Sequence, residues 1–247
     1  MAWYKEWFGQ EYLELYAHRD RGEAERHVDF VEARFADRKP RAVLDLACGA
    51  GRHIGALRRR GYRALGVDLS LTLLTQSPEL PRVAGDMRSL PFADSTFDWV
   101  LNFFTSFGYF ESERENFRIL EEMVRVMRPG GRFLIDLFNI DRVLATLNPR
   151  ETREMSGRRV EIERWYDARS RRLNKQIRVH TAGRPSRSYL ESVRAYRLEE
   201  VSNGLEWAGL RLEETFGDFG GEEFGPDSER LIFVGSRPHS QEPPPSQ

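Results

Sequence analysis

The residues best suited to hold a ligand lie close together, in the run Asp45-Leu46-Ala47-Cys48-Gly49-Ala50-Gly51. Gly49 and Gly51 allow the backbone to turn tightly and to lie against a ligand without an intervening Cβ. The residues from Arg52 to about Arg60 are expected to form a helix directly after this turn. Free N–H groups at the start of a helix favour an anion. The run therefore predicts a loop that binds a negatively charged group.

Three aspartates stand at the expected carboxyl ends of three successive strands. Asp45 precedes the glycines, Asp68 closes the segment Gly66-Val67-Asp68, and Asp86 follows Gly85. A carboxylate in the position of Asp45 can hold an ammonium group, whereas it would repel a pyrophosphate. Asp68 could accept hydrogen bonds from both hydroxyls of a ribose, and Asp86 from the amino group of an adenine. Together they favour an adenosine that carries an amino acid.

A dinucleotide site is the main alternative, because it also uses a glycine-rich turn between a strand and a helix. The third glycine of the pattern G-x-G-x-x-G is missing here, since position 54 is Ile and the next glycine is Gly55. This departure and the carboxylate of Asp45 disfavour a nicotinamide-dependent oxidoreductase. That alternative stays open because Asp68 would suit a ribose of either cofactor class.

The elements that must position these residues alternate between apolar runs and helical segments. The helix expected at Ser112–Met127 begins with a possible capping box of Ser112 and Glu115, and Arg128-Pro129-Gly130-Gly131 is expected to end it with a turn. Strands that are apolar at almost every position, separated by helices, indicate a mostly parallel sheet covered on both faces. The expected strands are 42–47, 64–69, 82–85, 97–103 and 131–138.

A second pattern begins after residue 150. Residues 160–163, 177–180 and 189–198 alternate apolar with polar side chains, as half-exposed antiparallel strands do. A helix over 199–209 and two closing strands over 211–219 and 230–236 are expected next. The predicted domains are a helical cap (1–38, with a helix at 23–36 after a loop at 18–22), a core (39–150 and 199–236), an antiparallel insertion (151–198) and a disordered tail (237–247).

The order LDLACGAG, GVDLS, GDMRSLPF, FDWVLNFFTSFGYF and RPGG, over roughly residues 40–138, resembles the class I S-adenosylmethionine (SAM)-dependent methyltransferase family. The resemblance implies a Rossmann-like seven-stranded α/β sheet with its last strand antiparallel. It also implies SAM as cofactor and S-adenosylhomocysteine as product. By resemblance, Asp45, Ala47 and the segment Gly49-Ala50-Gly51 hold the methionine part, Asp68 with Leu69 the ribose, and Asp86 with Met87 the adenine. The insertion is similar, more loosely, to that of sugar-amine N-methyltransferases.

The methyl acceptor should lie beyond the fourth strand, where Asn102 and Phe103 would face the methyl group. An aromatic face there could attract the sulfonium, although these rings could equally serve only for packing. A general base is needed only for some acceptors, and the candidates are Tyr16, His18, Tyr109 and Asp136. Arg19 could pair with the SAM carboxylate or lie on the surface between helices.

Composition limits the other classes of function. The 247 residues include 38 basic and 39 acidic side chains, for a formal net charge of -1, so neither nucleic acid nor a membrane is an expected partner. Only one cysteine is present, which favours a reducing cytoplasm, and the scattered histidines favour no metal site. We therefore expect an enzyme that methylates nitrogen or oxygen of a small molecule. A non-catalytic SAM-binding protein and a homodimer joined through the insertion stay open, and the acceptor itself cannot be read from the sequence.

Overall fold

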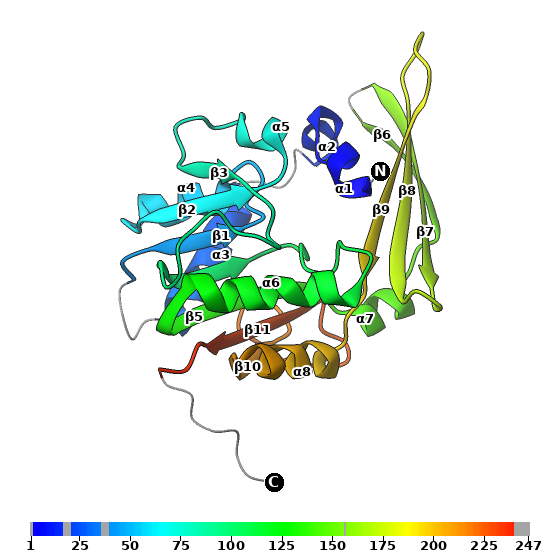
Figure 1. Cartoon of the computed structure of the whole chain (residues 1–247). Coiled ribbons are helices and arrows are strands. Elements are labelled where there is room, and N and C mark those ends of the chain that lie inside the picture. Colours follow the sequence, from blue (N-terminus) through cyan, green and yellow to red (C-terminus); the bar gives the residue numbers. More distant parts are fainter. Residues whose placement is uncertain (1, 17–20, 36–39, 156, 240–247) are drawn as a thin grey trace.

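The central element is a seven-stranded sheet, shown by a computed structural model that describes residues 2–16, 21–35, 40–155 and 157–239. The strand order is β10-β11-β5-β4-β1-β2-β3 (Figure 1). Only β11 runs antiparallel to its neighbours, as the sequence predicts. The strands are β1 (Val43–Leu46), β2 (Ala64–Asp68), β3 (Arg82–Ala84), β4 (Phe97–Asn102), β5 (Met127–Phe138), β10 (Arg211–Phe216) and β11 (Arg230–Ser236).

The strand order reverses beside β1, which is hydrogen-bonded to β2 on one side and to β4 on the other. A ligand of such a sheet binds at the carboxyl ends of the strands on either side of this reversal. The β1 side chains are all buried, because helices cover both faces of the sheet. The loops that follow β1, β2, β3 and β4 therefore meet at one edge, and they contain the residues that the sequence singles out.

Helices lie on both faces of this sheet (Figure 1). On one side α3 (Arg21–Arg34) packs against α4 (Arg52–Arg59), and on the other α6 (Glu113–Val126) packs against α8 (Leu198–Ala208). Ser112 caps α6 by accepting a hydrogen bond from the Glu115 N–H at 3.2 Å, as expected. Two smaller helices are α5 (Leu71–Leu74) and α7 (Ile140–Ala145). Helix α3 begins at Arg21, so the expected loop at residues 18–22 is wrong for Arg21 and Gly22.

One expected turn is part of a strand. Strand β5 begins at Met127, so Arg128-Pro129-Gly130-Gly131 lies within it and not in a separate turn. The pairing with β4 shifts register there, from Phe97↔Met127 to Trp99↔Arg132. Extra residues in one strand of a pair are accommodated by a bulge. The glycines and the proline mark this bulge, which explains why they resembled a turn signal.

A second sheet of four antiparallel strands follows the core strand β5, and it stands beside the first two helices (Figure 1). It contains β6 (Arg150–Met155), β7 (Arg158–Asp167), β8 (Arg172–His180) and β9 (Arg187–Arg194). The sequence predicted three of these strands and missed β6, whose residues Arg-Glu-Thr-Arg-Glu-Met hold one apolar side chain. The third predicted run ends at Arg194 and not at residue 198, where α8 begins.

The helices α1 (Trp3–Trp7) and α2 (Gln10–Leu15) pack on the inner face of this second sheet. Trp7 and Leu15 are buried against Val160, Ile177 and Val179 of strands β7 and β8. The apolar side chains of these strands therefore pack against the amino-terminal helices. Those helices lie between the second sheet and the ligand-binding edge of the first sheet.

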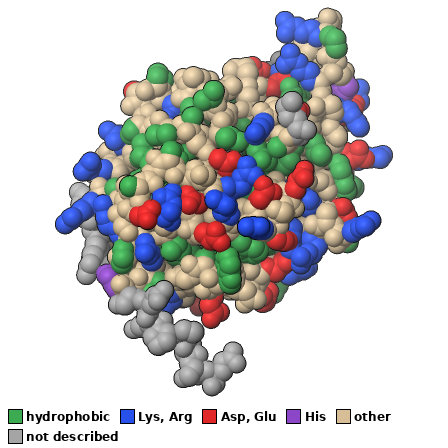
Figure 2. All heavy atoms as spheres, viewed as in Figure 1, with side chains coloured by type: hydrophobic (Ala, Val, Ile, Leu, Met, Phe, Trp, Pro, Cys, Tyr) green, Lys and Arg blue, Asp and Glu red, His purple; other side chains and the backbone are tan. Residues whose placement is uncertain are grey.

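The surface carries both signs of charge. Acidic and basic side chains alternate across the middle of the face in Figure 2, with no large area of one sign there. Within the described part of the chain, no helix is both long and apolar enough to cross a membrane. The same residues contain no group of three or more His, Cys, Asp or Glu that could hold a metal ion.

Candidate functional site

The glycine loop after β1 is closed by Asp68. Ala47, Gly49 and Gly51 have φ angles of 59°, 53° and 85°, the left-handed region that favours glycine. The Gly49 N–H donates a hydrogen bond of 2.7 Å to Oδ2 of Asp68 at the end of β2. Gly51 directly precedes α4. The loop therefore begins after Leu46, turns over the end of β2 and leads into the first turn of α4.

The position of Ile54 shows why the third glycine of a dinucleotide pattern is absent. Ile54 is a fully buried residue of α4, and a Cβ added to Gly66 would lie 2.3 Å from its Cδ1 and 2.5 Å from Sγ of Cys48. The glycine that permits close packing of this helix and sheet is thus on the strand β2. The loop therefore makes a turn like that of a dinucleotide site, but the glycine that allows close packing lies on the strand and not in the loop.

Asp45 carries the clearest signal for a ligand. Its side chain is 1% exposed, and among the described residues no donor reaches its Oδ2 atom. Burial, and then the charge of Asp68, raises the pKa of Asp45 to about 8. A buried oxygen without a partner is costly, and a cation would relieve that cost. This residue therefore fits the ammonium group of a bound amino acid.

The other two strand-end carboxylates already have partners. Asp68 accepts from the backbone N–H groups of Gly49 and Ser70, at 2.7 and 2.8 Å; burial still raises its pKa. Although burial opposes it, the hydrogen bonds and charge of Arg88 lower the pKa of Asp86. The Asp86–Arg88 ion pair measures 2.6 Å. Each carboxylate oxygen has two lone pairs, so both residues retain the capacity to accept from a ligand.

All three aspartates line one cavity of about 760 Å³. One side of this cavity is polar and contains the predicted cofactor residues; the other side is aromatic. Of the predicted residues, it is lined by Tyr16, Asp45, Ala47, Gly49, Ala50, Asp68, Leu69, Asp86, Met87, Phe103 and Tyr109.

The aromatic side is formed by the amino-terminal helices and the loop after β4. Tyr4, Phe8, Tyr12 and Tyr16 project from α1 and α2 or directly after them, and Tyr109 faces them from the loop. The Phe8 and Tyr109 rings stack with centroids 5.7 Å apart and planes 18° apart. We call these five residues the aromatic wall. Rings of this kind suit a flat or apolar ligand and can attract a cation to their faces.

Tyr16 connects the aromatic wall to the second sheet. Its hydroxyl donates to Oε1 of Glu191 at 3.1 Å, and Nζ of Lys175 donates to the Tyr16 oxygen. Lys175 also lies 3.4 Å from Oε2 of Glu191. A phenol between a cation and a carboxylate can accept one proton while it passes its own to the carboxylate. The structure therefore places one predicted base in a polar cluster at the aromatic side of the cavity.

Asp136 does not line the cavity, and its position argues against catalysis. It is fully buried on β5, and its Oδ2 accepts from the Phe104 N–H at 2.7 Å. Arg230 lies 2.6 Å from its Oδ1. Burial raises the pKa of Asp136, against the opposing charge of Arg230. Phe104 and Thr105 have φ angles of 60° and 55°, so Asp136 holds a strained turn that lines the cavity.

Four further predicted residues lie away from the cavity or outside the described chain. The Asn102 side chain is buried, where its Nδ2 donates to the Leu46 carbonyl at 2.9 Å and fixes the end of β1. Gly51 belongs to the loop but not to the lining. His18 and Arg19 lie outside the described residues.

A buried histidine pair beside the cavity was missed. His53 lines the cavity, and its Nε2 lies 3.1 Å from Nδ1 of His27. The His53 ring stacks on Phe103 at a centroid distance of 3.9 Å. Burial lowers the pKa of His27 to about 3 and that of His53 well below its usual value, so both rings are neutral near pH 7. The signal lay in the spacing: His27 follows Ala24 by three residues, which places it on the buried face of α3.

Comparison with known proteins agrees with this arrangement. A family model described as "Methyltransferase domain" matches residues 44–135. A demethylmenaquinone methyltransferase of Mycolicibacterium paratuberculosis is 30% identical over 184 residues, 71% of this chain and 71% of the relative. One from a Mycobacterium species is 39% identical over 109 residues, or 42% of this chain and 46% of the relative. The chain therefore spans about half the length of the first curated relatives that it matches.

The fold has solved counterparts as well. The sugar N-methyltransferase KedS8 from a Streptoalloteichus species superposes with a TM-score of 0.72 at 22% identity, over 93% of this chain and 94% of that one. At this level of sequence identity, the structural similarity shows a shared fold. The strand order, the glycine loop and the sequence relatives agree, and the chain belongs to the class I SAM-dependent methyltransferase family.

Proposed function

We propose that this chain transfers the methyl group of SAM to nitrogen or oxygen of a small-molecule acceptor. The supporting observation is the Oδ2 atom of Asp45, buried without a donor among the described residues at the edge where the family binds its cofactor. In this proposal Asp45 holds the ammonium of SAM, Asp68 the ribose and Asp86 with Met87 the adenine. The glycine loop and the start of α4 receive the carboxylate. SAM supplies a methyl group bound to a positively charged sulfur.

The aromatic wall is the proposed acceptor side. Residues on α1, α2 and the loop after β4 line the cavity opposite the cofactor residues. They exclude water and hold the acceptor in line with the methyl group, an effect that can be worth ~7–11 kcal/mol. The domain assignment follows the same division: the helical cap and the insertion shape the acceptor side, and the core holds the cofactor. A buried free thiol at Cys48 suits the reducing cytoplasm we propose as its compartment.

We propose that Tyr16 takes up a proton when the methyl acceptor has to lose one. The Tyr16 oxygen would take a proton from the methyl acceptor. At the same time the phenol proton of Tyr16 would pass to Oε1 of Glu191, 3.1 Å away. The ammonium of Lys175, which donates to the same oxygen, stabilises negative charge that develops there. This route uses only groups that are already in contact.

The acceptor class can be tested with compounds suggested by the relatives. SAM would be incubated with demethylmenaquinone in its reduced form, an amino sugar or a simple phenol, and S-adenosylhomocysteine would be measured by mass spectrometry. We expect turnover with the amino sugar or the phenol, and its loss in Asp45→Asn. Turnover of reduced demethylmenaquinone, which gains its methyl group on a ring carbon, would contradict methylation of nitrogen or oxygen. Tight SAM binding without turnover across all classes would instead support a non-catalytic SAM-binding protein.

A further inference from the structure

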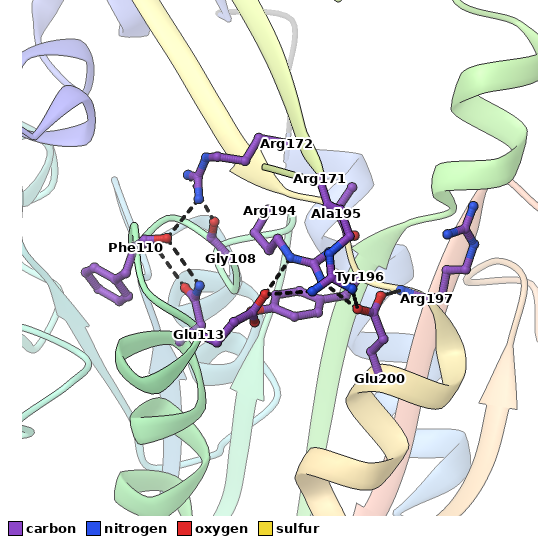
Figure 3. A network of polar contacts seen from close by, with 11 residues as sticks. Gly108, Phe110, Glu113, Arg171, Arg172, Arg194, Ala195, Tyr196, Arg197 and Glu200 are labelled. Carbon is purple, nitrogen blue, oxygen red and sulfur yellow. Dashed lines mark hydrogen bonds and ion pairs between the residues drawn. The ribbon is translucent and has the colours of Figure 1, made fainter. Parts of the chain in front are cut away.

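Arg172, at the start of β8, connects the second sheet to the acceptor side of the cavity. Its guanidinium donates to three consecutive carbonyl oxygens, those of Gly108 at 3.4 Å, Tyr109 at 3.2 Å and Phe110 at 2.9 Å. It also donates to Oγ of Ser192 on β9 at 2.8 Å. Figure 3 shows Arg172 reaching from the sheet to the loop. Tyr109 and Phe110 both line the cavity.

The contacts of Arg172 differ from those of its neighbour Arg194, which it faces across β8 and β9. Arg194 is 4% exposed and pairs with Glu113 at 2.7 Å and with Glu200 (Figure 3). The ion pairs among the described residues do not include Arg172, and burial lowers its pKa from the ordinary value. The guanidinium of Arg172 is half-buried, and it exchanges part of its hydration for carbonyl partners that its planar shape contacts in fixed directions.

The bound loop is restrained from two further directions. The Arg194 N–H donates to the Gly108 carbonyl at 2.8 Å, and Gly108 has a φ of 103°. A Cβ at Gly108 would lie 2.6 Å from the Arg194 carbonyl oxygen. On α6, Asn116 binds both the N–H and the carbonyl of Phe110, at 3.1 and 3.2 Å. Arg172 completes this set from the second sheet, so the position of the loop depends on that sheet.

We propose that Arg172 is a positioning residue that sets the acceptor side of the cavity by holding the backbone of Gly108, Tyr109 and Phe110. The inference rests on the proposed function, since it assigns the role of the insertion in that reaction. The hydrogen bonds of Arg172 go to Ser192 and to backbone carbonyls of the loop, and not to the predicted cofactor residues. Its effect is on where Tyr109 and Phe110 lie, and therefore on the acceptor and not on SAM.

Hydrogen–deuterium exchange of the S-adenosylhomocysteine complex tests this without a known acceptor. The amides of Phe104, Thr105 and Phe110 donate to protein acceptors and should exchange slowly. In Arg172→Met we expect the segment 104–110 to exchange about tenfold faster. The affinity for S-adenosylhomocysteine should stay within about twofold. Arg178→Met is the matched control, because Arg178 is an exposed arginine of the same strand, and it should change neither.

Unchanged exchange over 104–110 in Arg172→Met would overturn the proposal. So would faster exchange throughout the core with loss of cofactor binding, since that marks general destabilisation. If this variant does not fold, Arg172→Lys is measured by the same criteria. A point cation cannot span three carbonyls, so we expect intermediate exchange, and wild-type exchange in Arg172→Lys would contradict the role of the guanidinium.

Kinetics add a second readout once an acceptor is found. With that acceptor, Arg172→Met should raise the acceptor KM or lower kcat by about tenfold, while the KM for SAM stays unchanged. An equal rise in both KM values would contradict positioning. If the wild-type chain turns over no acceptor, the proposed function fails, whereas the exchange experiment still decides the role of Arg172.

Discussion

The two sides of the cavity are built by different means. The cofactor side consists of short loops at the ends of β1, β2 and β3. Backbone N–H groups of these loops hold Asp68, from Ser70 in its own loop and from Gly49 in the loop after the neighbouring strand. The acceptor side is assembled from α1, α2, the loop after β4 and, behind them, the second sheet. Its contacts join residues far apart in sequence, such as Tyr16 and Glu191.

This difference indicates that cofactor binding and acceptor binding depend on separate parts of the fold. A loop fixed by its own backbone can keep one cofactor while the elements around it change. An aromatic surface supported by a separate sheet can be altered without disturbing that loop. Substitutions should therefore divide into two classes, those that weaken SAM binding and those that change the acceptor reaction alone.

The largest expected effect is on the cofactor side, at Asp45. Asp45→Asn removes the charge that we assign to the SAM ammonium, which should weaken SAM binding by about 3 kcal/mol, or roughly a hundredfold. Calorimetric titration measures it. Asp98→Asn on β4, far from the lining residues, is the control and should leave SAM affinity unchanged. Equal affinity for the wild type and Asp45→Asn would remove the main support for the cofactor assignment.

The raised pKa of Asp45 predicts that the affinity for SAM depends on pH. With a pKa of about 8 before binding, Asp45 must lose a proton to pair with an ammonium, so SAM affinity should rise with pH by up to about tenfold per unit below pH 8. Asp45→Asn should show a flat profile over pH 6–8. An identical slope in both proteins would assign the pH dependence to another group.

On the acceptor side, Tyr16→Phe should lower kcat by about a hundredfold if the phenol carries the proton, with SAM affinity unchanged. The change removes the oxygen that contacts Lys175 and Glu191 and keeps the ring. Tyr12→Phe, from the same aromatic wall, is the matched control. A Tyr16→Phe enzyme with normal kcat would show that its acceptor needs no proton transfer through this residue.

Asp68→Ala should weaken SAM binding by ~1–3 kcal/mol if Asp68 holds the ribose as we propose, because it would remove those contacts. It also removes the acceptor for the Gly49 N–H. Asp68→Asn separates these effects, since its amide oxygen can still accept from Gly49. If Asp68→Asn binds SAM as tightly as the wild type while Asp68→Ala does not, Asp68 supports the loop and does not hold the ribose through its charge.

The smallest effect concerns the buried histidine pair beside the cavity. His27 has a pKa of about 3 in the fold, against 6.5 ordinarily, so the unfolded chain binds a proton that the fold excludes. Stability is therefore lost as pH falls from about 6.5 towards 3, by about 2 kcal/mol at pH 5 for this residue. Denaturant titrations at pH 7 and pH 5 should show a smaller loss in His27→Phe than in the wild type.

His180→Phe is the control for that measurement, because the His180 side chain is 37% exposed. Its loss of stability between the two pH values should match the wild type. A His27→Phe protein that loses as much stability as the wild type would show that His27 takes up its proton without unfolding.

The sequence predicts that Asp45, Asp68 and Asp86 meet at one edge of the sheet, as they do in the cavity, because the signals for these residues are local. Asp45, Asp68 and Asp86 each follow a recognisable strand, and parallel strands end at one edge, so their meeting follows from the fold. The sequence does not show the direction of a side chain. Asp136 and Asn102 also stand late in strands, yet both side chains are buried and bind backbone groups. Alternation in sequence does not tell which way such a side chain points relative to a cavity.

The acceptor side carries little local signal. Arg172 binds backbone carbonyls more than sixty residues earlier in the chain, and any residue type supplies a carbonyl. Strand β6 has few apolar residues because it lies at the edge of its sheet. The aromatic residues of the amino terminus were visible, but only packing against the second sheet turns them towards the cavity.

Calorimetric titration of the wild-type chain with SAM and, in parallel, with NADH decides which cofactor the cavity binds. Above pH 8, where Asp45 is ionised, we expect one SAM bound per chain and no measurable binding of NADH, because the buried carboxylate attracts an ammonium and repels a pyrophosphate. Binding of NADH without binding of SAM would contradict this expectation.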